Sequence, residues 1–158
     1  IINNNIMKIT SFNINLISYL IILVPNVLVY FMSRLQSIEK NTGSKIPFRP
    51  PPYVFALVWP ILLLLLGFSW YQSLSQGYLI NGGYILLIVF LSIWSTMYRF
   101  QKILGLFNII ISWLVTSYLI LSRISSSPSW LLVPLNLWLI FAAVLNYYSF
   151  KIEQKDLK

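Results

Sequence analysis

Residues 53–72, which read YVFALVWPILLLLLGFSWYQ and contain no charged residue, decide the fold. The stretch has the length that a helix needs to cross the hydrocarbon of a bilayer, about 20 apolar residues. Its central run, from Ile61 to Leu66, favours insertion by about 0.3 to 0.6 kcal/mol per residue. Because hydrocarbon contains no water to pair with backbone N–H and C=O groups, the segment is predicted to be an α-helix.

The rest of the chain has the same apolar character. Of the 158 residues, 58% are hydrophobic and 9% are charged, whereas a soluble domain is about a quarter charged. We therefore predict an all-α membrane protein whose single domain, residues 15–150, is a bundle of five transmembrane helices. The predicted spans are 15–32, 53–72, 79–98, 103–121 and 129–150, with a poorly ordered leader over 1–14 and a basic cytosolic tail over 151–158.

Lysine and arginine predict the orientation in the membrane. Of the eleven basic residues, Lys8 and Arg123 fall on one side of the predicted topology and the other nine fall on the opposite side. Because basic residues collect on the cytosolic side, the N-terminus is predicted outside and the C-terminus in the cytosol. A mitochondrial outer membrane, the endoplasmic reticulum and a bacterial inner membrane all fit. The nine are Arg34, Lys40, Lys45, Arg49, Arg99, Lys102, Lys151, Lys155 and Lys158.

The composition excludes most catalytic chemistry. The chain has no cysteine and no histidine, which removes thiolate nucleophiles, the usual general base and most zinc ligands. Its carboxylates are Glu39, Glu153 and Asp156, so a buried carboxylate pair is not available. The net charge of +8 is scattered between apolar runs, which argues against nucleic acid as a partner. We expect no metal site, no catalytic side chain of these types and no required cofactor.

Three prolines lie within or near the predicted spans, at Pro25, Pro60 and Pro134. Each removes a helix hydrogen bond and tends to kink the helix. Kinked helices pack imperfectly, and a bundle made of them can leave a central cavity for a ligand. The alternative is that the prolines are packing kinks only.

The entry to the second span is rich in proline and carries two cations, because residues 45–53 read KIPFRPPPY. Proline fixes φ, and in the first turn of a helix it leaves no N–H unpaired. On spacing alone, the segment is predicted to be an ordinary proline start of the second span, with a rigid lid or hinge as the alternative.

The fifth span carries a regular apolar row, whose successive members are spaced by about one helical turn and are predicted to face the bundle together. The row consists of Pro134, Trp138, Phe141 or Ala142, and Leu145. The small Ala142 leaves room for a ligand. Asn146 lies at a depth where an unpaired amide is costly, and we expect it to bond a neighbouring helix rather than the ligand.

These segments together resemble the translocator protein family, also called tryptophan-rich sensory proteins (TspO/MBR). Residues 45–59 resemble the family pattern K-P-x-[WF]-x-P-P-x-[WY]-x-[FL]-x-x-V-W, and Trp94-Ser95 resembles the W-S of the third helix. Residues 133–147 resemble V-P-Y-x-x-W-x-x-F-A-x-x-L-N-Y. The resemblance implies a five-helix membrane bundle whose cavity opens near the long loop after the first helix. It also implies binding of porphyrins such as haem and protoporphyrin, and in animal members of cholesterol and drug-like ligands.

Carried over to this sequence, the resemblance and the apolar row predict a ligand site. Indole faces at Trp59, Trp94 and Trp138 would stack on a flat macrocycle. Arg49, Lys45 or another loop cation would pair with its carboxylates. The alternative for any tryptophan, notably Trp70 and Trp130, is a membrane-interface anchor. The predicted ligand-binding residues are Arg49, Pro50, Pro51, Tyr53, Trp59, Trp94, Pro134, Trp138, Phe141, Ala142, Leu145 and Asn146.

Several family positions differ in this chain. Polar positions before the W-S of the third helix are Leu87 and Leu91, and the tyrosine after Pro134 is Leu135. The resemblance therefore implies a more apolar cavity, which favours a sterol as second ligand class. As sterol-motif candidates, Leu145, Tyr147 and Lys151 fit the L/V-x-Y-x-K/R pattern proposed for cholesterol contact, with an aromatic belt and cationic anchor as the alternative.

The leading functional prediction is a membrane receptor or carrier for a flat hydrophobic ligand, porphyrin or haem first and sterol second. One alternative is light- and oxygen-dependent porphyrin breakdown, with which the family has been associated, and another is a structural membrane protein without ligand. The predicted partners are membrane lipid and the ligand. Family members dimerise through small residues of the third helix, and this span offers Ser92, Ser95 and Thr96 for a homodimer but no G-x-x-x-G pair.

Overall fold

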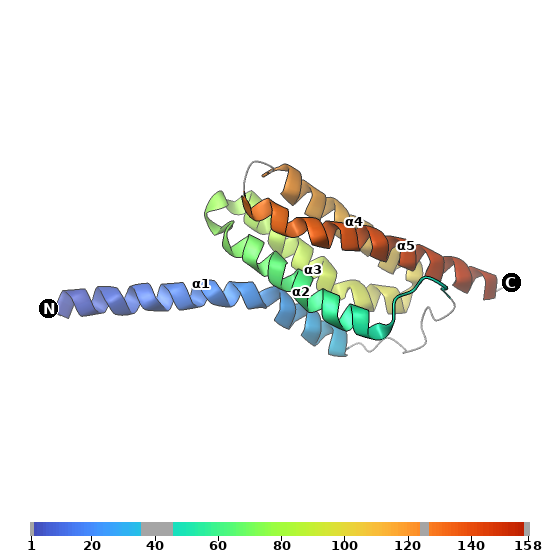
Figure 1. Ribbon diagram of the computed structural model, residues 1–158, viewed down its shortest axis with the longest axis horizontal. Helices are drawn as coiled ribbons and strands as arrows, with labels where there is room; N and C mark the ends of the chain where they lie inside the picture. Colours follow the sequence, from blue (N-terminus) through green and yellow to red (C-terminus); the bar gives the residue numbers. More distant parts are fainter. Residues whose placement is uncertain (1, 36–45, 124–126, 157–158) are drawn as a thin grey trace.

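The computed structural model describes the backbone of residues 2–35, 46–123 and 127–156, and the side chains of residues 19–35, 46–123 and 129–155. Within these ranges the chain forms five α-helices, two short 3₁₀ helices and no strand (Figure 1). The predicted all-α bundle of five helices is confirmed. The elements are α1 (Ile2–Leu35), α2 (Pro52–Tyr71), η1 (Leu74–Gln76), α3 (Tyr78–Phe100), α4 (Lys102–Leu121), η2 (Ser127–Leu132) and α5 (Val133–Asp156).

Four segments of the described chain are long and apolar enough to cross a membrane. They are Pro52–Tyr71, Tyr78–Phe100, Lys102–Leu121 and Ser129–Lys155, and a shorter apolar helix, Tyr19–Leu35, belongs to α1. Large apolar side chains also cover the outside of the bundle, for example Leu57, Val89, Leu114 and Leu137. A soluble monomer rarely exposes so much contiguous apolar surface, whereas hydrocarbon solvates it.

The first helix is longer than its predicted span. It begins at Ile2 and therefore includes residues 2–14, which the sequence analysis assigned to the leader. In Figure 1 its N-terminal part projects beyond the bundle, and its C-terminal part lies along α2. The two helices approach closely at Gly67 of α2, where an added Cβ would lie 2.1 Å from the carbonyl oxygen of Ile22. A glycine at this position therefore lets the backbones touch.

The start of the fifth helix differs from the prediction. Residues 129–132 belong to the 3₁₀ helix η2, and α5 begins at Val133, so Pro134 is its second residue. In the first turn of a helix the N–H groups have no intrahelical partner, and a proline there removes no hydrogen bond. The predicted kink at Pro134 is therefore wrong, while Pro25 and Pro60 do lie inside α1 and α2.

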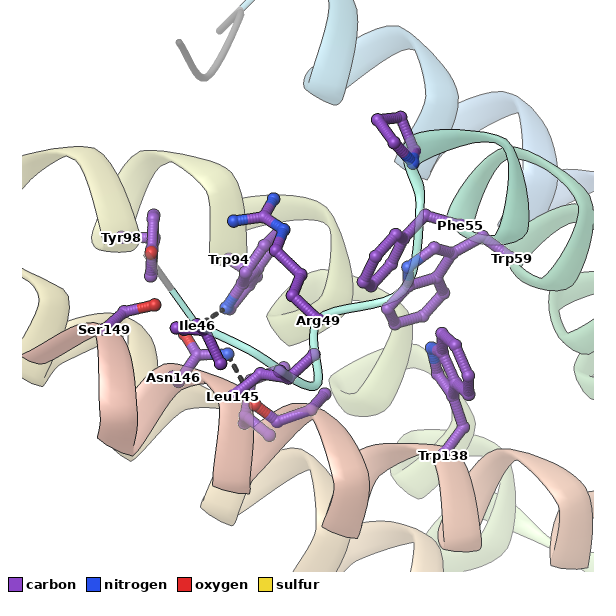
Figure 2. A pocket seen from close by; sticks show the side chains of 13 residues that line it. Ile46, Arg49, Phe55, Trp59, Trp94, Tyr98, Trp138, Leu145, Asn146 and Ser149 are labelled. Carbon is purple, nitrogen blue, oxygen red and sulfur yellow. Dashed lines mark hydrogen bonds between the residues drawn. The ribbon is translucent and has the colours of Figure 1, made fainter. Parts of the chain in front are cut away.

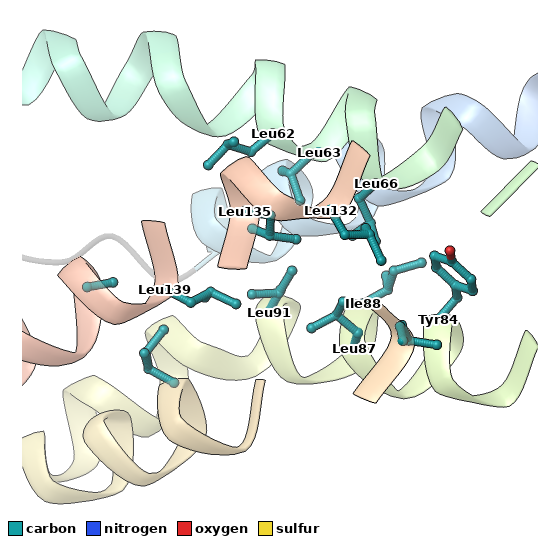
Figure 3. Packing of buried hydrophobic residues seen from close by; sticks show 13 residues of the cluster. Leu62, Leu63, Leu66, Tyr84, Leu87, Ile88, Leu91, Leu132, Leu135 and Leu139 are labelled. Atoms are coloured by element: carbon teal, nitrogen blue, oxygen red, sulfur yellow. The ribbon is translucent and has the colours of Figure 1, made fainter. Parts of the chain in front are cut away.

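The interior of the bundle is filled in the half nearest η1 and η2. Leucines from α2, α3, η2 and α5 meet there in one cluster, and the fully buried Tyr84 lies at one edge of it (Figure 3). Leu87, Leu91 and Leu135, which replace polar or aromatic family residues, all belong to this cluster. They help to fill this half of the bundle, whereas different side chains line the other half. The labelled members are Leu62, Leu63, Leu66, Tyr84, Leu87, Ile88, Leu91, Leu132, Leu135 and Leu139.

A buried polar cluster closes the end of this leucine core. Arg123, 7% exposed, donates a hydrogen bond to Ser73 Oγ. Ser69 Oγ lies 2.6 Å from the Tyr84 hydroxyl, and Ser129 Oγ donates to the Arg123 carbonyl over 2.9 Å. Because these groups come from α2, α3 and the segments flanking the α4–α5 connection, the cluster holds the helix ends together without a described carboxylate.

The opposite end of the bundle collects the basic residues. The end of α1, the start of α2, the α3–α4 turn and the end of α5 lie at this end (Figure 1). Arg34 is in the last turn of α1, Arg99 and Lys102 flank the α3–α4 turn, and Lys155 is in the last turn of α5. Lys102 Nζ pairs with Glu153 Oε1 at 3.0 Å and so ties α4 to α5.

Candidate ligand-binding cavity

A cavity of about 490 Å³ occupies the basic end of the bundle, beyond the leucine core. This volume is within the range of small-molecule sites, about 300–1,000 Å³. Its walls come from the first turns of α2, the last part of α3, α5 and the loop before α2 (Figure 2). The lining residues are Ile46, Arg49, Pro52, Phe55, Trp59, Trp94, Tyr98, Ile109, Trp138, Ala142, Leu145, Asn146 and Ser149.

Three indoles form much of the wall, one from each of α2, α3 and α5. The Trp138 ring meets Phe55 edge to face, with ring centroids 5.7 Å apart, and Phe141 at 5.3 Å. Trp94 packs beside Tyr98 with centroids 5.4 Å apart. Figure 2 shows Trp138 rising from α5 opposite Phe55 and Trp59. Aromatic faces of this kind suit a flat apolar guest.

Asparagines satisfy several of the indole N–H groups across helix boundaries. Trp94 Nε1 donates to Asn146 Oδ1 over 3.3 Å, which joins α3 to α5, and Asn146 Nδ2 donates to Ala142 O over 2.7 Å. The prediction that Asn146 bonds a neighbouring helix is confirmed. Trp113 Nε1 likewise donates to Asn136 Oδ1 over 3.2 Å. Trp70, considered as an interface anchor, is partly buried and donates to an asparagine of α3.

Trp138 departs from this pattern. Its Nε1 is buried and has no hydrogen-bond partner among the described residues. A buried donor without a partner costs about 1–3 kcal/mol, and such groups are rare in folded proteins. Since Trp138 lines the cavity, a ligand with an acceptor is the simplest partner for this N–H.

Arg49 supplies the charge of the cavity. Its guanidinium carbon lies 5.8 Å from the centre of the Phe55 ring, a cation–π contact that keeps the head over the entrance side of α2. The sequence has no acidic residue between positions 40 and 152, and none of the described residues that line the cavity is a carboxylate that could offset this charge. The site is therefore apolar with one cationic corner.

The proline-rich loop folds over the cavity mouth. Ile46 is 3% exposed and lines the cavity, and Arg49 N donates to Ile46 O over 3.2 Å in a tight turn. Phe48 meets Tyr148 of α5 edge to face, with ring centroids 5.1 Å apart. Pro52 is the first residue of α2. The prolines therefore start α2 as an ordinary helix entry does, and the Phe48 contact joins the loop to α5.

Seven of the predicted ligand-binding residues line the cavity, and an eighth, Phe141, packs on Trp138. Pro50, Pro51, Tyr53 and Pro134 do not line it, and Tyr53 is 71% exposed. Pro51 instead precedes the first residue of α2 and sets its start. Lys45, the other predicted carboxylate partner, lies outside the described residues. The seven are Arg49, Trp59, Trp94, Trp138, Ala142, Leu145 and Asn146.

The inward face of α5 is centred on a row next to the predicted one. Its most buried residues repeat with alternating spacings of four and three, the spacing of a seam between packed helices. Pro134 belongs to the neighbouring row and is exposed, whereas Trp138 and Leu145 lie beside the buried row and reach the cavity from there. The buried row consists of Leu135, Leu139, Ala142, Asn146 and Ser149.

The sterol-motif residues do not share a surface. Leu145 is 8% exposed and faces the cavity, whereas Tyr147 is 47% exposed and Lys151 is also exposed. An interface position suits Tyr147 and Lys151, and Trp130, 62% exposed, has the same character.

Sequence reasoning missed several wall residues. Phe55 lies four residues before Trp59 and Tyr98 four after Trp94, so helical spacing from the predicted tryptophans could have found both. Ser149 lies three residues after Asn146, so the same spacing could have found it, whereas Ile109 carries no such signal because no site residue was predicted on α4.

The fold and the cavity define the class of protein: an integral membrane protein whose helical bundle encloses an aromatic-walled site. The TspO/MBR family matches residues 18–151, and the chain belongs to this family. It is similar to the tryptophan-rich protein TspO of Chlorobaculum tepidum, with 31% identity over 117 residues that cover 68% of this chain and 74% of the relative. The resemblance drawn from the loop and helix motifs is confirmed.

Proposed function

We propose that the protein is a membrane receptor or carrier that binds a flat, apolar ligand in this cavity. The first candidate is a porphyrin such as haem or protoporphyrin, which has an acidic edge, and the second is a sterol. The observation that carries the proposal is the unpaired, buried N–H of Trp138 in an aromatic cavity. A ligand acceptor at this N–H would remove the cost of leaving it unpaired.

Shape and charge support the same ligand class. A planar macrocycle would lie against the indoles of Trp59, Trp94 and Trp138, which together come from three helices. A carboxylate at its rim would meet Arg49, which forms planar, paired hydrogen bonds with carboxylates. Such binding changes no chemical group of the protein, and it requires no cofactor.

We propose further that the cavity opens toward the cytosol. Its mouth lies at the end of the bundle that carries Arg34, Arg99, Lys102 and Lys155, and basic residues collect on the cytosolic side. The C-terminus would then be cytosolic and the N-terminus outside. Because the chain has no cysteine, a single Gln154→Cys or Ser75→Cys variant can be labelled with an impermeant maleimide on intact cells. Labelling of Gln154→Cys alone would overturn this orientation.

A fluorescence titration tests the ligand proposal. Protoporphyrin added to the purified protein in detergent should quench tryptophan fluorescence with saturation. The Trp138→Phe variant keeps an aromatic ring but loses the N–H, and the affinity should fall about tenfold, the size expected for a hydrogen bond to a charged group. Trp130→Phe is the matched control, since Trp130 is exposed and lines no part of the cavity, and its affinity should be unchanged.

The role of Arg49 is separated by changing the ligand as well as the protein. Arg49→Gln should weaken binding of protoporphyrin but leave binding of its dimethyl ester nearly unchanged, because the ester has no carboxylate. Absence of saturable quenching at tens of micromolar protoporphyrin would refute the porphyrin proposal and leave the sterol or a purely structural role.

Illumination distinguishes binding from breakdown. If the protein only binds, the absorbance spectrum of the complex in air stays constant under light. A new bilin-like absorbance that appears in the light and is lost in Trp138→Phe would assign a degradative activity instead.

A further inference from the structure

A second cavity, of about 620 Å³, lies on the other side of the aromatic wall. It is bounded by α1, α2 and α3 and shares Phe55, Trp59, Trp94 and Ile109 with the first cavity. The remaining lining residues are Asn26, Val27, Val29, Tyr30, Ser33, Ala56, Pro60, Leu63, Leu91, Ser92 and Ser95. The two cavities are therefore neighbours separated by one layer of side chains.

Two polar atoms of this second cavity have no partner among the described residues. Ser92 is 8% exposed, and its Oγ is buried without a hydrogen bond. Asn26 Nδ2, on α1, is also buried and unpaired. By contrast, Ser112 of α4, a fully buried serine that lines neither cavity, donates a hydrogen bond to Asn108 O over 2.9 Å. A serine within a helix can ordinarily donate to the carbonyl oxygen four residues before it, and Ser92 does not make this hydrogen bond.

The chemistry of the lining selects the occupant. Among the described residues, no lysine, arginine, aspartate or glutamate lines the cavity, so a charged head group would lose its hydration without a counter-charge from this part of the chain. An amide N–H and a hydroxyl instead suit one neutral hydroxyl or carbonyl oxygen. Val27 and Tyr30, 61% and 65% exposed, place the α1 rim at the lipid-facing surface. A long apolar chain could enter there from the bilayer.

We propose that this second cavity binds a neutral single-chain amphiphile, such as a fatty alcohol or a monoacylglycerol, with its head oxygen between Ser92 Oγ and Asn26 Nδ2. This site differs from the first cavity in charge: the first has Arg49 and suits an anion, whereas none of the described residues that line the second is charged. The inference does not depend on porphyrin binding.

Photo-crosslinking tests the proposal. The purified protein is placed in phosphatidylcholine nanodiscs with a diazirine-bearing hexadecanol, illuminated and analysed by peptide mass spectrometry. Adducts should concentrate on residues 26–33 and 91–95. A probe with the same alkyl chain but a sulfate head group should label these segments at least about tenfold less, because its charge would be buried without a partner.

Variants with a matched control make the test specific. Ser92→Ala and Asn26→Leu should each lower the labelling about fivefold, the loss of one hydrogen bond. Ser92→Thr keeps the hydroxyl and should retain the labelling, and Ser112→Ala should be labelled like the unchanged protein. Circular dichroism melting of each variant separates a lost site from a lost fold, and Ser92→Ala should still bind protoporphyrin.

Three results would overturn the proposal. The first is labelling spread evenly over the lipid-facing surface of the bundle. The second is equal labelling by the alcohol and the sulfate. The third is disulfide formation between two copies of a Val27→Cys variant, in a chain that has no other cysteine, which would assign the exposed α1 face to a dimer instead of an amphiphile.

Discussion

Replacement of Gly67 by alanine should detach α1 from α2. The added Cβ would lie 2.1 Å from the carbonyl oxygen of Ile22 and 2.7 Å from its carbonyl carbon, both backbone atoms that cannot rotate away. Carbon and oxygen in contact normally stand about 3.3 Å or more apart, so the two helices must separate by roughly 1 Å. Overpacking of this kind costs about 1–3 kcal/mol. The better helix propensity of alanine offsets about 0.5–1 kcal/mol of this cost, which leaves a net loss of about 1 kcal/mol.

Two other glycines provide graded controls on α3. A Cβ at Gly82 would meet nothing within 4 Å, so Gly82→Ala should be neutral or stabilising by about 0.5–1 kcal/mol. A Cβ at Gly83 would lie 2.8 Å from Leu119 Cδ2, a side-chain end that can move. Gly83→Ala should therefore fall between the other two variants. The free energy of unfolding should be highest for Gly82→Ala, intermediate for Gly83→Ala and lowest for Gly67→Ala.

Reversible unfolding with sodium dodecyl sulfate in mixed micelles, followed by tryptophan fluorescence, measures this order. Because α1 forms one wall of the second cavity, Gly67→Ala should also reduce amphiphile labelling there. A Gly67→Ala protein as stable as the Gly82→Ala protein would refute the close approach of α1 and α2 and with it the shape of that cavity.

Two further predictions concern the first cavity. Asn146→Leu leaves the partly buried Trp94 Nε1 without its acceptor and should lower the free energy of unfolding by about 1–2 kcal/mol in the same assay. Adding Trp94→Phe to that variant should recover part of the loss, because both hydrogen-bond partners are then gone. No recovery would mean that the pair is not coupled. Ile46→Ala removes the side chain that closes the mouth and should speed both association and release of protoporphyrin in stopped-flow quenching, whereas the exposed neighbour in Pro47→Ala should not. Equal rates in both variants would refute this closure of the mouth by Ile46.

Much of the fold could be predicted because the bilayer makes each span decide its own structure. In hydrocarbon a backbone group can pair only within its helix or with another buried group, so an apolar run of sufficient length specifies a helix by itself. Residues 53–72 and 103–121 matched α2 and α4 to within one residue. The start of α5 was missed because 129–132 are as apolar as a helix but form η2, with Pro134 fitted to the first turn.

The candidate site was predictable in its residue types and less so in its geometry. Trp59, Trp94 and Trp138 were placed in the wall by their motifs, and the structure brings all three together. Pro134 and Tyr53 matched the same motifs yet do not line the cavity, because they set or flank helix starts. The unpaired Trp138 N–H could not be foreseen, since it depends on which asparagines reach which indoles across the bundle.

The sequence by itself determined where this chain crosses the membrane, which end carries the positive charge and which aromatic residues it can offer a ligand. Only the tertiary structure decided how each helix is rotated. On α5 the row with Trp138 and the row with Leu139 are both apolar, and lipid is as apolar as a protein interior, so hydropathy does not distinguish the face that meets lipid from the face that meets the bundle. That choice comes from packing: leucines from the other helices fill one half of the interior, and the indoles are left to wall the hollow half.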